Sequence, residues 1–308
     1  MILFSGNSNI DLARKISKKI GIKLGNALVD KFPEGEIRVK INENVRGKDV
    51  FVIQSTCPPV NDNLMELLIL IDALRRASAK RITAVIPFFG YARQDRKDQP
   101  RVPITAKLVA NILTQAGADR ILTMDLHAGQ IQGFFDIPVD HLLAAPVFIN
   151  YFKKKKIKNL VVATADIGGI KLVWYFAEKL NIPLVVVDKK RRGPESVDAM
   201  HLIGDVKGKN ILIPDDMLAT GGTLAQAAKF VKSQGALKVF ACMTHGLFSG
   251  NAIHKMQDTP IEEIVVTDTI PQHDRSQIKK ITVLSVAWLF GEAIKRIHNE
   301  KTISQLFK

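Results

Sequence analysis

Two adjacent acidic residues and a pair of glycines follow one apolar stretch of the chain. The segment Ile211–Thr223 reads ILIPDDMLATGGT, so an expected strand leads into Asp215 and Asp216, then a Thr-Gly-Gly-Thr turn, then a helix that begins near Leu224. Carboxylates accept hydrogen bonds from a vicinal diol, and the free amides at a helix start bind an anion. The segment therefore predicts a site for a phosphorylated sugar. The alternative interpretation is an ordinary turn with two solvated acids.

The turn itself supports the first interpretation. Gly221 and Gly222 allow the backbone to turn tightly and to approach a ligand closely. The hydroxyls of Thr220 and Thr223 add hydrogen-bond donors for phosphate oxygens. A strand, two acids, this turn and a helix in that order are more specific than a Gly-Gly pair alone.

A second polar loop follows the expected strand Ile82–Ile86 and holds several cations. Arg93, Arg96 and Lys97 lie close together in it, with Gln94 between them. Because arginine binds phosphate in a bidentate geometry, this loop is typical of a polyphosphate site. A basic surface loop without a ligand is the alternative.

Three further segments place polar residues directly after expected strands, where open α/β sheets bind their ligands. They are DLHAG at Asp125–Gly129, TADIGG at Thr164–Gly169 and VDKKRRGPES at Val187–Ser196. The last contains four consecutive cations before Gly-Pro, and we expect it to form an exposed, mobile loop. A lone histidine such as the one in DLHAG is more often structural than functional.

Short apolar, β-branched runs alternate with amphipathic segments and must position these residues. Continuous apolar runs indicate strands buried on both faces, and the alternation with helices predicts an α/β fold with a largely parallel sheet. The expected strands include Ile2–Phe4, Val50–Ile53, Ile82–Ile86, Ile121–Met124, Leu160–Ala163, Leu184–Val187, Ile211–Ile213 and Ile264–Thr267.

Two amphipathic segments, Pro103–Ala116 and Val286–His298, predict helices with one buried face each. The buried stripe of the first is expected at Ile104, Leu108 and Ile112. That of the second is expected at Val286, Leu289, Phe290, Ile294 and Ile297.

Composition limits the classes of protein to which the chain can belong. The 308 residues carry 44 basic and 30 acidic side chains, a formal charge of +14, which fits nucleic acid, an anionic membrane surface, phosphate-rich substrates or simple solubility. Two cysteines, Cys57 and Cys242, exclude a disulfide scaffold and suit a reducing compartment. We find no signal peptide or membrane span and expect a cytoplasmic protein. The run Lys153–Lys156 is interpreted as a solvated face at the end of a helix.

These motifs lie within a resemblance that spans nearly the whole chain, from FSGNSN to ISQLF. The chain resembles the ribose-phosphate pyrophosphokinases, also called phosphoribosyl pyrophosphate synthetases. The most specific segments are KFPEGEIRV, VRGKDVFVIQST, NDNLMELLILIDALRRASAKRITAVIPFFGYARQDRK, PITAKL and DLHAGQIQGFFDIPVDHL. The resemblance implies a ribose-phosphate diphosphokinase for nucleotide biosynthesis. Such an enzyme moves the β,γ-diphosphoryl group of ATP to the anomeric hydroxyl of ribose 5-phosphate, with Mg²⁺ as cofactor, and forms phosphoribosyl pyrophosphate and AMP.

The resemblance also implies an architecture: two similar phosphoribosyltransferase-like α/β domains with the active site between them, each with a mostly parallel sheet flanked by helices. We expect an N-terminal domain over residues 1–144, and a C-terminal domain over residues 145–285 that carries the ribose-5-phosphate loop. A helix within residues 286–308 should pack back on the first domain. The expected assembly is a dimer-based homo-oligomer, such as a hexamer, with an ATP site shared between subunits. Neither nucleic acid nor a membrane is an expected partner.

The same resemblance assigns roles to individual residues. Catalytic contacts to the transferring phosphate are expected from Lys189 and Arg191. The expected ATP-binding residues are Phe32, Glu34, Glu36, Arg93, Gln94, Arg96 and Lys97. The expected ribose-5-phosphate-binding residues are Asp215, Asp216, Ala219, Thr220, Gly221, Gly222 and Thr223. His127 and Asp166 are the expected metal ligands.

Some features leave alternatives open. Ala219 stands where many family members carry a third acid in the sugar-phosphate loop. A candidate effector site for phosphate and ADP comprises Arg46, Gln132, Asp140 and Ser304. A phosphoribosyltransferase that uses the product, or a non-catalytic regulatory relative, are the alternative functions; formation of AMP would separate them from a synthetase.

Overall fold

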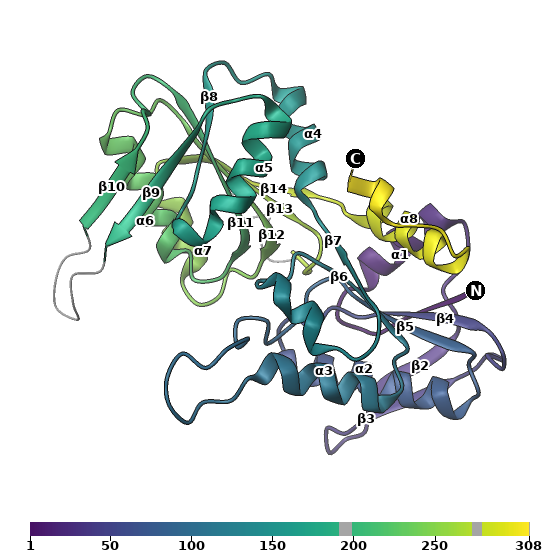
Figure 1. Cartoon of the computed structure of the whole chain (residues 1–308). Helices are drawn as coiled ribbons and strands as arrows, with labels where there is room; N and C mark the ends of the chain where they lie inside the picture. The colour runs from purple at the N-terminus through teal and green to yellow at the C-terminus, as the bar shows by residue number, and fades with distance from the viewer. Residues whose placement is uncertain (191–198, 273–278, 308) are drawn as a thin grey trace. The chain divides into compact units, whose positions relative to one another are not determined.

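The computed structural model describes residues 1–190, 199–272 and 279–307, which fold into two compact units (Figure 1). Unit 1 comprises Met1–Leu143, Thr269–Pro271 and Ser285–Lys308, and unit 2 comprises Ala144–Asp268 and Gln272–Leu284. Each unit contains one mostly parallel sheet with helices packed against it. The predicted α/β class with mostly parallel sheets is therefore confirmed.

The central sheet of unit 1 is entirely parallel and has the strand order β1-β4-β5-β6-β7. Its strands are β1 (Ile2–Ser5), β4 (Asp49–Ile53), β5 (Arg81–Ile86), β6 (Arg120–Met124) and β7 (Val139–Leu142). A separate antiparallel hairpin is formed by β2 (Ala27–Lys31) and β3 (Ile37–Ile41). Parallel neighbours put the carboxyl ends of β5 and β6 at the same edge of the sheet, so the loops that follow them are adjacent.

The helices of unit 1 are α1 (Ile10–Ile20), α2 (Val60–Arg76), α3 (Thr105–Ala116) and α8 (Ala287–His298), with the 3₁₀ turns η1 (Gly129–Phe134) and η4 (Ser304–Phe307). The C-terminal helix α8 packs beside α1, where the yellow and purple ends of the chain meet in Figure 1. The predicted stripe of α8 is confirmed, because its five residues, from Val286 to Ile297, are all buried.

The predicted stripe of α3 is wrong. Leu108 is 56% exposed, whereas the buried residues of this helix are Ala106, Val109, Ala110 and Leu113. Apolar residues lie on both sides of α3, so periodicity alone did not identify the side that faces the core.

The sheet of unit 2 has the order β10-β9-β8-β11-β12-β13-β14, and only β10 runs antiparallel to its neighbour. Its strands are β8 (Leu160–Ala163), β9 (Leu184–Lys190), β10 (Ala199–Ile203), β11 (Asn210–Leu218), β12 (Val239–Gly246), β13 (Ile261–Thr267) and β14 (Ile281–Leu284). The helices are α4 (Ala145–Lys155), α5 (Ile170–Leu180), α6 (Gly222–Ser233) and α7 (Ala252–Gln257), with the 3₁₀ turn η2 (Ile167–Gly169).

One sequence expectation needs correction in unit 2. Strand β11 extends to Leu218, so Asp215 and Asp216 lie on the strand and not in the loop after it. The solvated face expected at Lys153–Lys156 is exposed throughout, and Lys155 Nζ in it also donates to Glu263 Oε2 at 2.5 Å. Among the residues that the structure describes, no helix is long and apolar enough to cross a membrane.

Candidate active site

The acidic pair of unit 2 lies where β11 extends past one of its neighbours. Strand β11 pairs with β12 as far as Leu218, but with β8 only over Asn210–Leu212. Beyond Leu212, β11 is therefore no longer paired with β8, and Asp215 and Asp216 lie on this extension. Asp166 follows the end of β8, the next strand in the sheet. The structure thus brings the three predicted carboxylates to one edge of the sheet.

Electrostatics in this acidic group favour a proton on Asp215. Burial and the neighbouring charge of Asp216 raise the pKa of Asp215 to about 8, with a smaller contribution from Asp166. The backbone N–H of Asp216 donates to Asp215 Oδ1 at 2.8 Å, and this hydrogen bond lowers the pKa but is outweighed by burial and charge. At neutral pH Asp215 is mostly protonated, so it can donate a hydrogen bond to a hydroxyl as well as accept one.

The turn after β11 exposes the start of α6. Gly221 has a φ of 72° and caps the helix, and a side chain there would place its Cβ 2.6 Å from Met256 Cε. The N-cap residue Gly221 has no side chain with which to accept a hydrogen bond from the first turn of α6. The amides of that turn have no acceptor within the helix, so they are suited to bind an anion. The side chains of Thr220 and Thr223 are exposed beside them.

Ala219 lies just before this turn and is held through its backbone. Its carbonyl oxygen accepts from the N–H of Ser249 at 2.9 Å, and its side chain is partly buried. The residue therefore shapes the turn, and the methyl group offers no polar contact to a sugar.

Strand β9 brings the first predicted catalytic residue to the same edge. The backbone of Lys189 pairs with Met200 of β10, and β9 lies next to β8 in the sheet. The side chain of Lys189 and all of Arg191 lie outside the described part of the structure. The strands that carry or precede Lys189, Asp166 and Asp215 are thus consecutive neighbours, in the order β9-β8-β11.

In unit 1 the predicted polyphosphate loop follows β5, and the His127 loop follows the adjacent strand β6. The side chains of Arg93, Arg96 and Lys97 are exposed. Gln94 is less free, because its Oε1 accepts from Thr105 Oγ1 at 2.5 Å, at the start of α3.

A hydrogen bond joins these two loops. Gln130 Nε2, on η1, donates to Asp95 Oδ2 at 3.0 Å. On the same loop, the N–H of Leu126 donates to Nε2 of His141 at 2.9 Å, so β7 fixes the backbone beside the exposed His127. Predicted ATP-binding residues and a predicted metal ligand therefore occupy neighbouring, connected loops.

Two hydroxyls that sequence reasoning missed hold the base of the β5 loop. Ser55 Oγ accepts from the N–H of Phe88 at 3.1 Å. Thr56 Oγ1 donates to the carbonyl of Phe88 at 3.0 Å and accepts from the N–H of Gly90 at 2.6 Å. A Cβ on Gly90 would lie 2.6 Å from Thr56 O, so this close approach requires glycine. The only signal in the sequence was a Ser-Thr pair one residue beyond a buried strand.

The remaining predicted ATP-binding residues lie at the turn of the β2–β3 hairpin. Phe32, Glu34 and Glu36 are exposed, and the turn is closed by a hydrogen bond from the N–H of Phe32 to the carbonyl of Glu36 at 2.8 Å. The Arg38 guanidinium lies 5.1 Å from the centroid of the Phe32 ring. Phe32 is 39% exposed, so its ring remains accessible for stacking.

Comparison with known proteins identifies the family. A family model described as the N-terminal domain of ribose phosphate pyrophosphokinase matches residues 1–117, and one described as the phosphoribosyl synthetase-associated domain matches residues 179–308. A ribose-phosphate pyrophosphokinase of Caldanaerobacter subterraneus subsp. tengcongensis is 55% identical over 99% of this chain and 97% of that protein. The chain belongs to the ribose-phosphate pyrophosphokinase family. The family predicted from the sequence is therefore confirmed.

Further relatives agree over the same length. The ribose-phosphate pyrophosphokinase of Wolinella succinogenes is 53% identical, over 99% of this chain and 98% of that protein. The crystal structure of phosphoribosylpyrophosphate synthetase from Mycobacterium smegmatis superposes with a TM-score of 0.92 at 41% identity, and the match covers 97% of this chain and 99% of that one. Membership of this family favours a synthetase over the two alternative functions.

The four residues of the predicted effector site all lie in unit 1, and three of them already make hydrogen bonds within the chain. Asp140 Oδ2 accepts from Arg120 Nη1 at 2.7 Å. Gln132 Nε2 donates to the carbonyl of Gly129 at 2.9 Å, and the hydroxyls of Ser304 and Thr302 lie 2.7 Å apart. Arg46 is exposed. An effector site at these residues stays a prediction.

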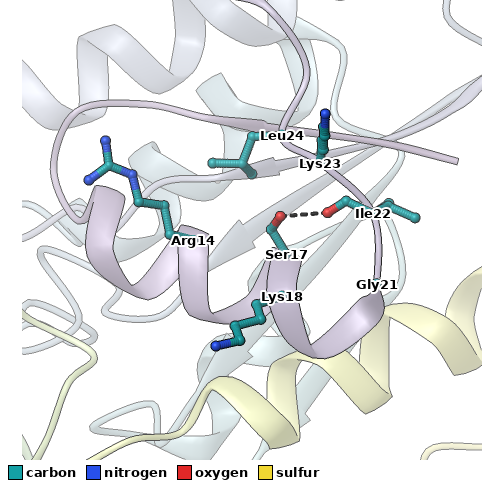
Figure 2. A pocket seen from close by; sticks show the side chains of 7 residues that line it. All are labelled: Arg14, Ser17, Lys18, Gly21, Ile22, Lys23 and Leu24. Carbon is teal, nitrogen blue, oxygen red and sulfur yellow. Dashed lines mark hydrogen bonds between the residues drawn. The ribbon is translucent and has the colours of Figure 1, made fainter.

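A hollow of about 440 Å³ at the carboxyl end of α1 lies outside the candidate active site. It is lined by Arg14, Ser17, Lys18, Gly21, Ile22, Lys23 and Leu24. Figure 2 shows Arg14 and Lys18 extending to different sides of the helix. Because the negative end of the helix dipole faces this hollow and its cations do not converge, we assign it no phosphate-binding role.

Proposed function

We propose that the chain transfers the β,γ-diphosphoryl group of ATP to the anomeric hydroxyl of ribose 5-phosphate and forms phosphoribosyl pyrophosphate and AMP. The observation that supports this most strongly is the edge of the unit 2 sheet, where β9, β8 and β11 bring Lys189, Asp166 and the Asp215–Asp216 pair to neighbouring strands. A ribose-phosphate diphosphokinase activity agrees with the family to which the chain belongs.

Ribose 5-phosphate occupies the end of β11 in this proposal. The 5-phosphate binds the free amides at the start of α6 and the hydroxyls of Thr220 and Thr223. The ribose hydroxyls bind the Asp215–Asp216 pair, in which a protonated Asp215 donates one hydrogen bond and Asp216 accepts another. This arrangement orients the sugar and leaves its anomeric hydroxyl free to attack.

ATP is assigned to unit 1. Arg93, Arg96 and Lys97 bind its phosphates, and Gln94 adds a polar contact from the same loop. On the exposed hairpin, Phe32 stacks on adenine, and Glu34 and Glu36 bind the polar edge of the base. We propose that they do so in a neighbouring subunit of a dimer-based homo-oligomer, as in the family that the chain resembles.

Negative charge develops on the diphosphoryl group during the transfer and must be stabilised by nearby cations. Lys189 and Arg191 supply cations at the β-phosphorus, and positioning plus charge stabilisation accounts for most of the acceleration in such transfers. Exclusion of water by the Val187–Ser196 segment would suppress hydrolysis of ATP.

The residues present fit Mg²⁺ as the cofactor. Over the described ranges 1–190, 199–272 and 279–307, no three or more His, Cys, Asp or Glu side chains form a group that could hold a metal ion alone. Mg²⁺ instead takes one or two protein ligands and completes its shell with water and substrate phosphates. His127 would hold Mg²⁺ on the ATP, and Asp166 would hold Mg²⁺ at the ribose hydroxyls. Burial and the neighbouring charges of Asp216 and Asp166 raise the pKa of Asp215, and those charges favour a dication near Asp166. When bound, Mg²⁺ neutralises phosphate charge.

An assay for AMP tests this function. The purified chain with Mg²⁺ and ATP should release AMP only when ribose 5-phosphate is added. Lys189→Ala should lower turnover about a hundredfold or more while the KM values change little. The exposed Lys153→Ala, at the end of α4, is the matched control and should leave turnover unchanged. Absence of AMP from the wild-type chain, or normal turnover in the Lys189 variant, would contradict the assignment.

A further inference from the structure

A buried threonine connects two of the strands that meet at the unit 2 site. The Oγ1 of Thr164 accepts from the N–H of Val187 at 2.9 Å and donates to the carbonyl of Val187 at 3.4 Å. The N–H of Thr164 donates to the carbonyl of Val185 at 3.2 Å. Thr164 and Val187 are both fully buried. One side chain therefore satisfies both polar groups of a residue on the neighbouring strand.

The hydroxyl of Thr164 accepts a hydrogen bond for which the backbone of β8 offers no acceptor at this point. The ladder between β8 and β9 pairs Ala163 with Val185, and β8 ends at Ala163, with three residues between it and η2. Strand β9 continues to Lys190. Without the hydroxyl, the buried N–H of Val187 would lose its partner, and a buried unpaired donor is unfavourable.

The position of this connection relative to the predicted site residues is specific. Asp166 follows Thr164 by two residues, and Lys189 follows Val187 by two residues. The hydrogen bonds of the hydroxyl thus join β8 and β9 two residues before the predicted metal ligand, Asp166, on one side and two residues before the predicted catalytic lysine, Lys189, on the other. A shift of either strand end by about 1 Å is enough to lower turnover strongly in positioned catalysis.

We propose that Thr164 is a positioning residue that fixes the carboxyl ends of β8 and β9 against each other and so sets the spacing between Asp166 and Lys189. This inference rests on the proposed function. It adds a residue that contacts no substrate and acts only through the two strands that it joins.

Three variants test the hydroxyl itself. Thr164→Val keeps the branched shape and removes the hydroxyl, Thr164→Ala removes it without adding a methyl group, and Thr164→Ser retains it. We expect Val and Ala to lower kcat about tenfold or more, with the KM for ATP nearly unchanged, and Ser to retain wild-type kcat within about threefold. Hydrogen exchange, followed by mass spectrometry on the segment 184–190, should be faster in the Val and Ala variants than in the wild type or the Ser variant.

Thr267→Val is the matched control. Thr267 is also fully buried at the end of a strand, and its Oγ1 donates to the carbonyl of Thr244 on the neighbouring strand at 2.7 Å. Neither β12 nor β13 carries a predicted site residue. We expect Thr267→Val to lower Tm about as much as Thr164→Val does while kcat stays at the wild-type value.

The outcomes are distinguishable. A wild-type chain that forms no AMP from ATP and ribose 5-phosphate contradicts the proposed function. Wild-type turnover in an active Thr164→Val variant, a loss in Thr164→Ser as large as that in Thr164→Val, or failure of both hydroxyl-free variants to fold overturns the positioning role alone.

Discussion

His298 Nδ1 and Asp49 Oδ2 lie 2.7 Å apart and join the last residue of α8 to the first residue of β4. The same carboxylate accepts from Arg81 Nε at 2.8 Å and from Arg81 Nη2 at 2.6 Å. Nη2 of Arg81 also donates to the carbonyl of Ile297 at 3.2 Å. The side chains of Asp49, Arg81 and His298 thus hold the C-terminal helix to the central sheet of unit 1.

Asp49→Asn should destabilise the protein by about 2 kcal/mol at neutral pH, because Arg81 loses its bidentate carboxylate. Burial alone would raise the pKa of Asp49, but the hydrogen bonds from Arg81 and His298 outweigh it and hold this pKa below its ordinary value. The contribution of a carboxylate with a lowered pKa is fully present above the pKa of the unfolded chain, about 4, and is lost as pH falls through the lower pKa of the folded protein. Urea unfolding of wild type and variant across pH 3 to 8 measures this.

The exposed pair on α2 supplies the control for this prediction. Asp72 accepts from Arg76 at 2.7 Å, but both side chains are well exposed. Asp72→Asn should change the free energy of unfolding by about 0.5 kcal/mol or less. A difference between wild type and Asp49→Asn that stays constant down to pH 3 would show that the carboxylate charge is not responsible.

Thr83→Val should leave the stability unchanged or raise it by about 1 kcal/mol. Thr83 is fully buried on β5, and its Oγ1 has no hydrogen-bond partner among the described residues. A buried hydroxyl without a partner is unfavourable, and valine replaces it with an apolar group of similar shape. Thr123→Val is the matched control on β6, because Thr123 Oγ1 donates to the carbonyl of Ile86 at 2.8 Å. It should lower the free energy of unfolding by about 1 kcal/mol. Equal effects of the two substitutions would refute this account.

Asp215→Asn should stabilise the ligand-free protein increasingly as pH rises from about 4 to about 8. The folded pKa of Asp215 is raised to about 8, first by burial and then by the charge of Asp216. Across that window the unfolded chain releases a proton that the folded chain retains, so wild-type stability falls as pH rises. Asparagine is neutral throughout and avoids this loss. Thermal unfolding midpoints at half-unit pH intervals measure the difference, with the exposed Asp98→Asn as a control. A difference that does not change with pH would count against the raised pKa.

Strands with continuous apolar runs were well predicted from the sequence, whereas the ends of strands were not. Leu160–Ala163 has the same bounds in the structure, because four buried apolar residues leave little ambiguity. Strand β11 is longer than its apolar run, since pairing with β12 extends it through the acids to Leu218. The end of β11 is decided by its pairing with β12, a distant part of the chain. Local residue patterns in a single sequence do not reveal such a pairing.

The candidate site was likewise predicted only in part from the sequence. The residue types and their order after each strand were readable, because glycines, paired acids and cations have distinct chemistry. The sheet order β9-β8-β11, which makes Lys189, Asp166 and Asp215 neighbours, was not readable from local patterns. Thr164 was missed because a threonine at a strand end is common, and only its bond to Val187 distinguishes it.

Gly221→Ala should destabilise unit 2 and weaken binding of ribose 5-phosphate, whereas Gly222→Ala should not destabilise it. Gly221 has a φ of 72°, in the left-handed region, where an L side chain costs about 1–2 kcal/mol. Its Cβ would also lie 2.6 Å from Met256 Cε, so that side chain would have to move. At Gly222 the nearest atom to a new Cβ is Thr220 Oγ1 at 3.9 Å, and alanine suits the first helical position at least as well as glycine.

Urea unfolding compares the stabilities of the two variants, and the KM for ribose 5-phosphate reports the position of the α6 amides. We expect Gly221→Ala to raise this KM about tenfold or more. Equal stability of the two variants, or an unchanged KM in Gly221→Ala, would mean that the left-handed turn does not position the phosphate site.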